Sequence, residues 1–366
     1  MKFIINRETL LQPLQKIVNV IEKKQTMPIL SNILLLADEN KLILTGTDLE
    51  IQLIAKKNIA IEESGAITVP ARKFLDICRL LPNEASMFIE LNKQQLKIIS
   101  GKSRFNLATL PADDYPKFPD SDFEFNFSIN AEKLKLALDK TLFCMANQDV
   151  RYYLNGLMLN ISNNQLKLVA SDGHRLSIFE DEIMQATGLE KQIILPRKGI
   201  LELARLLDEL EQDVTIYCSS NNIKVLTQQF IFSAKLIDSK YPGYKKVFEQ
   251  DFNEQVFVDK VQLKDALTRV AILSNEKFRG VSLLIKEHTL VISTHNPEHE
   301  EAEEELDINY TGEPVSIAFN VQYLLDAVSK VDSKQVVLTI ASNLSSCFIE
   351  ETDRHQFIYI VMPMRL

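Results

Sequence analysis

Long hydrophobic runs, cysteine-rich motifs and a signal-like start are all missing from this sequence of 366 residues. No window approaches the roughly 18 uninterrupted apolar residues that a membrane-spanning helix needs. The sequence turns polar and charged soon after Met1, so we expect no secretory signal. The four cysteines lie far apart and fit no metal-ligand spacing. These absences favour a cytoplasmic protein with reduced thiols, without metal, cofactor or membrane contact.

Common catalytic and nucleotide-binding motifs are also missing. The sequence has no Walker loop, no dinucleotide-binding glycine motif and no G-x-S-x-G elbow. The net charge of −9 argues against a general nucleic-acid coat, although a basic surface can exist on an acidic body. A hydrophobic content of 46% is sufficient for packed cores.

The most informative pattern that is present is a threefold internal repeat. Phe3-Ile-Ile-Asn6, Phe127-Ser-Ile-Asn130 and Val256-Phe-Val-Asp259 each combine a short apolar strand with a residue suited to capping a helix. Leucines spaced four apart follow each segment, which predicts one apolar helical face per copy. Further along, Pro70-Ala-Arg-Lys-Phe-Leu matches Pro196-Arg-Lys-Gly-Ile-Leu, with a fainter third copy at Phe319-Asn-Val-Gln-Tyr-Leu-Leu. Copies of this length indicate domains rather than solenoid units.

The repeats predict an α+β fold of three similar domains, each with antiparallel sheets and two helices. Alternating apolar residues mark short strands that begin near Lys41, Ile51, Lys97, Gln165, Val214, Thr289 and Val336. Two proline-containing segments, Asp113-Asp-Tyr-Pro-Lys-Phe-Pro and Lys240-Tyr-Pro-Gly-Tyr, resemble each other and each closes a copy. We therefore expect domains at 1–120, 121–246 and 247–366.

Positive charge recurs on the predicted helices. Arg72 and Lys73 in copy one correspond to Arg197 and Lys198 in copy two. Each residue alone is most simply a solvated helix residue, but the recurrence favours a shared basic surface. Such a surface would bind phosphates without reading bases.

Three other clusters resemble chemical sites. His295-Asn-Pro-Glu-His299 matches a zinc-protease string, but Pro297 disfavours the helix that such a site needs. Ser171-Asp-Gly-His-Arg175 gathers the groups of a hydrolase triad, yet Asp-Gly favours an ordinary turn that could line a groove. Six glutamates between Glu298 and Glu305 form either a solvated face or a partner for a basic patch.

Seven longer segments resemble one family, the bacterial sliding clamps, which are the β subunits of DNA polymerase III. They are Met1-Lys-Phe, Thr45-Gly-Thr-Asp-Leu-Glu50, Val69-Pro-Ala-Arg-Lys-Phe74, Gln148-Asp-Val-Arg-Tyr-Tyr-Leu-Asn-Gly156, Asp172-Gly-His-Arg-Leu176, Leu273-Ser-Asn-Glu-Lys-Phe-Arg-Gly280 and Tyr359-Ile-Val-Met-Pro-Met-Arg-Leu366. The resemblance covers the whole chain. It implies a head-to-tail homodimer that closes into a ring around duplex DNA. It also implies a non-catalytic tether for DNA polymerase subunits, opened by a clamp loader and bound by peptides of the Gln-x-x-Leu-Phe type.

The resemblance also implies three sets of site residues. The peptide-binding groove comprises Leu154, Ser171, Gly173, His174, Arg175, Leu176, Pro242, Lys246, Val247, Asn320, Tyr323, Ser346, Ile360, Val361, Met362, Pro363 and Met364. DNA contacts are implied at Lys24, Gln148, Tyr152 and Tyr153, and we add the repeat-related Arg72, Lys73, Arg197 and Lys198. The ring interface places Lys102, Arg104, Phe105 and Leu107 against Ile272, Leu273, Glu300, Glu301, Glu303 and Glu304. Serine, lysine and lysine at 171, 246 and 24 stand where the family pattern has threonine, arginine and arginine.

Two other classes of protein remain possible from the residues alone. A hydrolase or zinc protease would need an assembled triad or metal site. A non-ring scaffold would share the repeats but remain monomeric.

Overall fold

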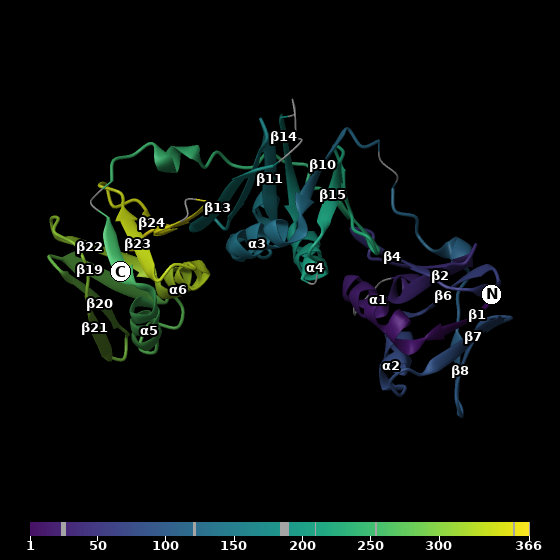
Figure 1. The fold of residues 1–366 in the computed structure, drawn as a ribbon. Helices are drawn as coiled ribbons and strands as arrows, with labels where there is room; N and C mark the ends of the chain where they lie inside the picture. The colour runs from purple at the N-terminus through teal and green to yellow at the C-terminus, as the bar shows by residue number, and fades with distance from the viewer. Residues whose placement is uncertain are drawn as a thin grey trace. The chain divides into compact units, whose positions relative to one another are not determined.

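The same order of elements occurs three times along the chain (Figure 1). The computed structural model describes residues 1–22, 27–119, 122–183, 190–208, 210–252, 255–353 and 356–365. Copy one comprises β1 (Lys2–Asn6), α1 (Arg7–Val20), β2 (Asn32–Asp38), β3 (Lys41–Thr47), β4 (Ile51–Asn58), β5 (Ile61–Glu63), β6 (Gly65–Pro70), α2 (Ala71–Leu80), β7 (Ser86–Asn92), β8 (Gln95–Ser100) and β9 (Ser103–Ala108). Short 3₁₀ turns accompany these elements.

Within the described residues, copies two and three repeat this order without a counterpart of β5. Copy two comprises β10 (Phe125–Asn130), α3 (Ala131–Thr141), β11 (Gly156–Ser162), β12 (Gln165–Ser171), β13 (Arg175–Glu182), β14 (Glu190–Pro196), α4 (Arg197–Leu207), β15 (Asp213–Cys218), β16 (Asn222–Leu226) and β17 (Phe230–Lys235). Copy three comprises β18 (Val256–Asp259), α5 (Lys260–Ala271), β19 (Gly280–Lys286), β20 (Thr289–His295), β21 (Glu301–Asp307), β22 (Val315–Asn320), α6 (Val321–Lys330), β23 (Gln335–Ile340), β24 (Cys347–Glu351) and β25 (Phe357–Val361). The predicted α+β class, with two α-helices in each copy, is confirmed.

The helices bury the leucine faces that the repeat predicts. All six leucines of the pattern are buried: Leu10, Leu14, Leu134, Leu138, Leu263 and Leu267. Figure 1 shows α1 beside α2, and α5 beside α6. Each pair packs its apolar stripes together because neither helix can bury its stripe alone.

Two of the three predicted helix caps form. The Asn130 side chain accepts a hydrogen bond from the N–H of Glu132 at 3.0 Å, and the Asp259 side chain accepts one from Gln262 at 2.9 Å. The prediction is wrong for Asn6, whose side chain makes no capping bond. The adjacent Arg7 N–H donates to the Ala85 carbonyl at 2.9 Å, and the equivalent N–H groups of Ala131 and Lys260 make the same kind of bond beside the two caps that form.

All pairings among the described strands are antiparallel, and two large sheets cross from one copy to the next. The order β10-β15-β16-β17-β4-β3-β2-β6 joins copies one and two through β17 and β4. The order β14-β11-β12-β13-β25-β24-β23-β18 joins copies two and three through β13 and β25. The smaller sheets, β5-β1-β7-β8-β9 and β21-β20-β19-β22, leave β9 and β21 as edge strands.

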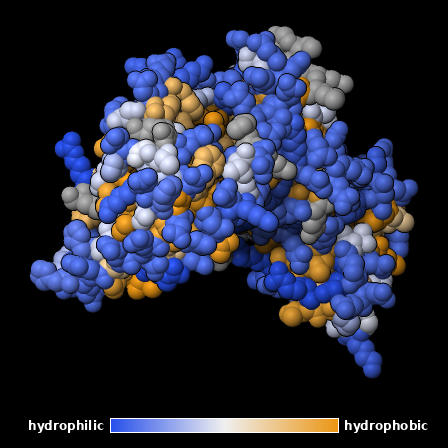
Figure 2. All heavy atoms as spheres, turned by 60° about the vertical axis from the view of Figure 1, so that its left-hand side comes forward, coloured by the Kyte–Doolittle hydropathy of each residue, from blue (hydrophilic) through white to orange (hydrophobic). Residues whose placement is uncertain are grey.

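By its contacts the chain forms two compact units, residues 1–135 with 198–236, and residues 136–197 with 237–366. No described helix has the length and apolar character to cross a membrane. On the face shown in Figure 2, hydrophilic residues dominate and apolar residues form small patches between them.

The zinc-protease interpretation of the His295 string is wrong. His295 ends β20, and His299 has a positive φ of 65° in the turn that leads to β21. The N–H groups of His299 and Glu300 donate to the carbonyl and side-chain oxygens of Asn296 at 3.1 and 2.9 Å. The two histidines therefore do not share a helical face, as the zinc-protease site requires.

Candidate functional site

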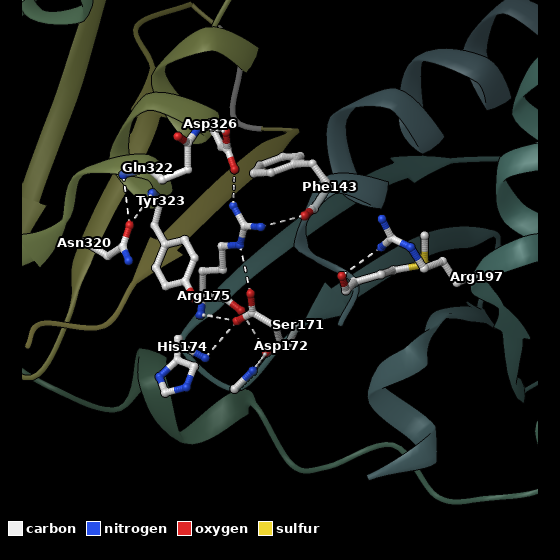
Figure 3. Close-up of polar contacts among 12 residues, drawn as sticks. Phe143, Ser171, Asp172, His174, Arg175, Arg197, Asn320, Gln322, Tyr323 and Asp326 are labelled. Atoms are coloured by element: carbon white, nitrogen blue, oxygen red, sulfur yellow. Dashed lines mark hydrogen bonds and ion pairs between the residues drawn. The ribbon is translucent and has the colours of Figure 1, made fainter. Parts of the chain in front are cut away.

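The turn between β12 and β13 is held by side chains of its own residues (Figure 3). The Asp172 carboxylate accepts hydrogen bonds from the N–H groups of His174 and Arg175 at 2.9 and 3.0 Å. Ser171 Oγ accepts the Gly173 N–H at 3.0 Å and donates to the Arg175 carbonyl at 2.8 Å. Gly173 has a φ of +90°, a conformation that favours glycine. The predicted turn is thus confirmed, and the Ser171 and Asp172 side chains bond within it rather than to the His174 ring.

Arg175 ties this turn to α6 of copy three. Its guanidinium donates to Asp172 at 3.0 Å, to Asp326 at 2.5 Å and to the Phe143 carbonyl at 3.0 Å. It also lies over the Tyr323 ring, 4.5 Å from the centroid. The side chain is only 13% exposed, so these charge-assisted bonds form mostly away from water.

The first turn of α6 supplies the opposite wall (Figure 3). Asn320 caps the helix by accepting from the N–H groups of Gln322 and Tyr323 at 2.9 and 3.4 Å. The Tyr323 ring stacks on the His174 ring with centroids 6.4 Å apart. Burial, together with the Asp172 carboxylate, raises the pKa of Tyr323, so its hydroxyl ionises only at a higher pH than that of a free tyrosine.

Backbone pairing brings the C-terminal segment to the same turn. Leu176 pairs with Ile360 and Arg175 pairs with Val361 across β13 and β25. The Met362 N–H then donates to the His174 carbonyl at 2.8 Å. Residues that are far apart in the sequence therefore form one continuous wall.

Beneath these walls lies an apolar cluster. Its buried members are Ala146, Leu154, Met158, Val169, Leu176, Ile178, Ile194, Tyr241, Phe348 and Ile360, with Val247 and Tyr153 partly buried against it. Ser346 is fully buried, and its hydroxyl lies 3.1 Å from the Gln250 amide nitrogen, which donates to it. Several predicted groove residues are therefore floor residues that stabilise the fold and leave little surface to a ligand.

The remaining predicted groove residues are more accessible. Pro242 and Lys246 are exposed, whereas Pro363 and Met364 are half-buried. The predicted groove did not include Asp172, Asp326 and Phe143, which hold Arg175 in place. The Asp-Gly turn signalled Asp172, but no local pattern connects Arg175 with a carboxylate 151 positions away.

The predicted DNA contacts differ in accessibility. Arg72 and Lys73 are exposed on α2. Tyr152 is 77% exposed. Gln148 is exposed and adopts a positive φ of 59°. Tyr153 is half-buried against the apolar cluster, and Lys24 lies outside the described residues.

Two predicted DNA contacts already have partners within the chain. Lys198 forms ion pairs with Glu22, at 2.6 Å, and with Asp48. Arg197 donates a hydrogen bond to the Met145 carbonyl at 2.9 Å. Lys198 therefore offers less positive charge than the sequence suggests.

The predicted interface residues lie on the two edge strands and beside them. Lys102 and Arg104 are exposed around β9, Phe105 is half-buried and Leu107 is buried in its own sheet. Ile272 is 77% exposed just after α5, and Leu273 is half-buried.

Most of the glutamate run lies on the edge strand β21, where Glu301, Glu303 and Glu305 are exposed. Glu301, Glu303 and Glu304 lie on β21, and Glu300 lies in the turn before it. Hydrogen bonds from Arg269 at 2.6 and 2.8 Å lower the pKa of Glu304. Among the described residues, no cluster of histidine, cysteine or carboxylate side chains has the arrangement of a metal site.

Comparison with known proteins places the whole chain in one family. Models of the N-terminal, central and C-terminal domains of the DNA polymerase III beta subunit match residues 1–119, 128–243 and 245–365. The beta sliding clamp of Pseudomonas aeruginosa is 45% identical and that of Escherichia coli K12 is 42% identical, each over 100% of both chains. A crystal structure of the Pseudomonas aeruginosa subunit superimposes with a TM-score of 0.97 at 44% identity over 100% of both chains. The chain therefore belongs to the beta sliding clamp family, the beta subunits of DNA polymerase III, and functions as a sliding clamp in DNA replication.

Proposed function

We propose that two copies of this chain close head to tail into a ring around duplex DNA. The ring would tether DNA polymerase subunits, and a clamp loader would open it. The same proposal makes the protein a non-catalytic, cytoplasmic accessory subunit. Its three domains would span 1–120, 121–246 and 247–366.

The observation that carries this proposal is the repeated junction between copies. The last of the three strands that follow the first helix of one copy pairs with the last strand of the next copy, as β4 pairs with β17 and β13 with β25. The equivalent strands whose outer edge is unpaired within the described chain are β21 of copy three and β9 of copy one. Pairing β21 with β9 of a second copy would repeat the junction, and two such contacts would close a ring.

Charge favours the same pairing. Lys102 and Arg104 flank one edge, and the other carries Glu301 and Glu303. Opposite charges across an interface fix the register and disfavour wrong partners. A head-to-head arrangement is disfavoured, because pairing β9 with β9 or β21 with β21 would place charges of the same sign together.

The groove around Arg175 is the proposed peptide site. An apolar floor with His174 and Tyr323 at its rim suits a short motif with leucine and aromatic side chains. The soft thioethers of Met362 and Met364 suit a groove that serves several partners. We propose Arg72, Lys73, Gln148 and Tyr152 as accessible DNA contacts, because they are exposed.

The ring is tested by Phe105→Asp. A carboxylate on β9 should destabilise pairing with the acidic β21, and light scattering should show a monomer where the wild type shows a dimer. Leu80→Asp is the matched control, because Leu80 is 84% exposed at the end of α2, away from β9. If Phe105→Asp remains a dimer, the proposed interface is wrong.

Topological binding requires a second measurement. Protein loaded onto nicked circular DNA should survive a salt wash and should leave after a single linearising cut. Retention after linearisation would identify an ordinary DNA binder and would refute the ring.

A further inference from the structure

A pocket of about 430 Å³ on copy three is not explained by the sites described above. Its walls are the loop before β19, the turn after β20, and the tail residues Met364 and Arg365. Met364 is its only lining residue in the predicted groove. Most of the lining surface is apolar and includes the Phe278 ring.

Strand pairing identifies the equivalent place in the other two copies. Asn32 pairs with Pro70, Gly156 with Pro196 and Gly280 with Asn320. In each pair the first residue starts the first strand after the first helix of its copy, and the second residue ends the strand before the second helix. The residue two positions before these three strand starts is Leu30, Leu154 and Phe278, respectively.

The three equivalent side chains differ sharply in exposure. Leu30 and Leu154 are each 2% exposed, whereas Phe278 is 56% exposed. A position that belongs to the core in two copies is therefore open in the third. Exposure of a large aromatic side chain beside a pocket is typical of a binding site.

A tyrosine from the linker packs at this position in copies one and two. Tyr115 is 5% exposed, and its hydroxyl lies 3.3 and 3.2 Å from the carbonyl oxygens of Asn32 and Thr45. Tyr241 is 4% exposed and belongs to the same apolar cluster as Leu154. Each tyrosine is followed by a proline, within the two linker segments that resemble each other.

In copies one and two, the linker that leads to the tyrosine bonds to equivalent strands, β6 and β14. The Leu110 N–H donates to the Thr68 carbonyl at 3.2 Å, and the Ile237 N–H donates to the Ile194 carbonyl at 2.9 Å. Thr68 and Ile194 both lie two residues before the proline that ends the strand.

The C-terminal segment of copy three makes the equivalent hydrogen bond to β22. The Met364 N–H donates to the Ala318 carbonyl at 2.8 Å, and Ala318 lies two residues before Asn320. Met364 thus takes the place of Leu110 and Ile237. Within the described residues, no tyrosine then covers Phe278.

We propose that this pocket binds an extended peptide segment of a partner protein that carries a Tyr-Pro pair preceded by acidic residues. The tyrosine ring would pack on Phe278 and on the Met364 thioether, a favourable sulfur–aromatic contact. Its hydroxyl would donate to the Gly280 carbonyl, as Tyr115 donates to the Asn32 carbonyl in copy one. The Gly280 carbonyl already accepts the Thr294 hydroxyl at 2.6 Å, and its second lone pair can accept another hydrogen bond. Arg365 at the pocket wall would pair with the acidic residues.

The linker of copy one provides the probe. A labelled synthetic peptide of residues 111–118 contains Asp113-Asp-Tyr-Pro116. Fluorescence polarisation should show saturable binding to the intact protein. Binding should weaken about tenfold with the peptide Tyr115→Ala and with the protein Phe278→Asp.

Matched variants make the test specific. Val261→Asp changes a 63% exposed apolar residue of the same copy and should bind as the wild type does. Arg365→Glu should weaken binding, and a peptide with lysines in place of both aspartates should restore it. Phe278→Asp should still bind a Gln-x-x-Leu-Phe peptide, so failure here is distinct from failure of the proposed groove.

Two outcomes would overturn the proposal. One is equal binding of the linker peptide to the wild type and to Phe278→Asp, or no binding at all. The other is conversion of the dimer to a monomer by Phe278→Asp, which would show that a second copy of the chain covers the pocket.

Discussion

Replacing Arg175 with methionine should both destabilise the protein and weaken its proposed peptide site. Methionine keeps much of the apolar stem but removes the bonds to Asp172, Asp326 and the Phe143 carbonyl. The two carboxylates are only 16% and 30% exposed, so water would compensate each of them incompletely.

The magnitude follows from what is left unpaired. Breaking a buried ion pair by removing one partner costs about 3–5 kcal/mol. Asp172 keeps its bonds from the N–H groups of His174 and Arg175, and Asp326 is partly solvated, so the lower part of that range applies. We expect a loss of about 3–4 kcal/mol in the free energy of unfolding of the unit that contains the site.

Urea unfolding followed by tyrosine fluorescence measures this loss, and peptide titration measures the site. Arg79→Met is the matched control, because Arg79 is 54% exposed and 3.9 Å from Asp76. An exposed pair of this kind contributes roughly 0–1 kcal/mol. If Arg175→Met costs no more than Arg79→Met, the guanidinium does not hold the turn against α6, and our account of the site is wrong.

Three further predictions follow from charges and thiols elsewhere. Lys140 is 5% exposed and lies 2.8 Å from the buried Glu351, so Lys140→Met should destabilise the protein by about 3–5 kcal/mol. Lys97→Met, at a more accessible pair whose side chains are 38% and 33% exposed, should cost under about 1 kcal/mol, and equal losses in urea unfolding would contradict this. Hydrogen bonds from Arg151 lower the pKa of Asp149 to about 2, below its unfolded value of about 3.9, so this contribution to stability is present above pH 4 and lost as pH falls through 2; carboxyl NMR titration should show that midpoint, and Arg151→Met should raise it. The four cysteines are buried, so iodoacetamide at pH 8 should label the native protein far more slowly than the unfolded one, and equal rates would refute their burial.

The elements were predictable because their signals are local. The alternation Thr289-Leu-Val-Ile-Ser predicts a strand, and the spacing of Leu263 and Leu267 predicts a buried helix face; both are found. The cap predicted at Asn6 does not form, although the same local pattern gives caps at Asn130 and Asp259, so the pattern alone does not determine where the Asn6 side chain bonds.

The site was less predictable from the residues themselves. The resemblance, rather than periodicity, grouped Leu154 with Ile360, and the structure does place them in one apolar cluster. The sequence predicts that the positive charge of Lys198 is available to DNA, but Glu22 and Asp48, which are far away in the sequence, form ion pairs with it. Pairings across such sequence distances depend on tertiary structure.

The sheets that cross between copies also bear on how such chains diverge. At each crossing the copies are joined by main-chain hydrogen bonds, which every residue except proline can supply. Substitutions at a crossing can therefore accumulate, provided that the inward-facing residues remain apolar.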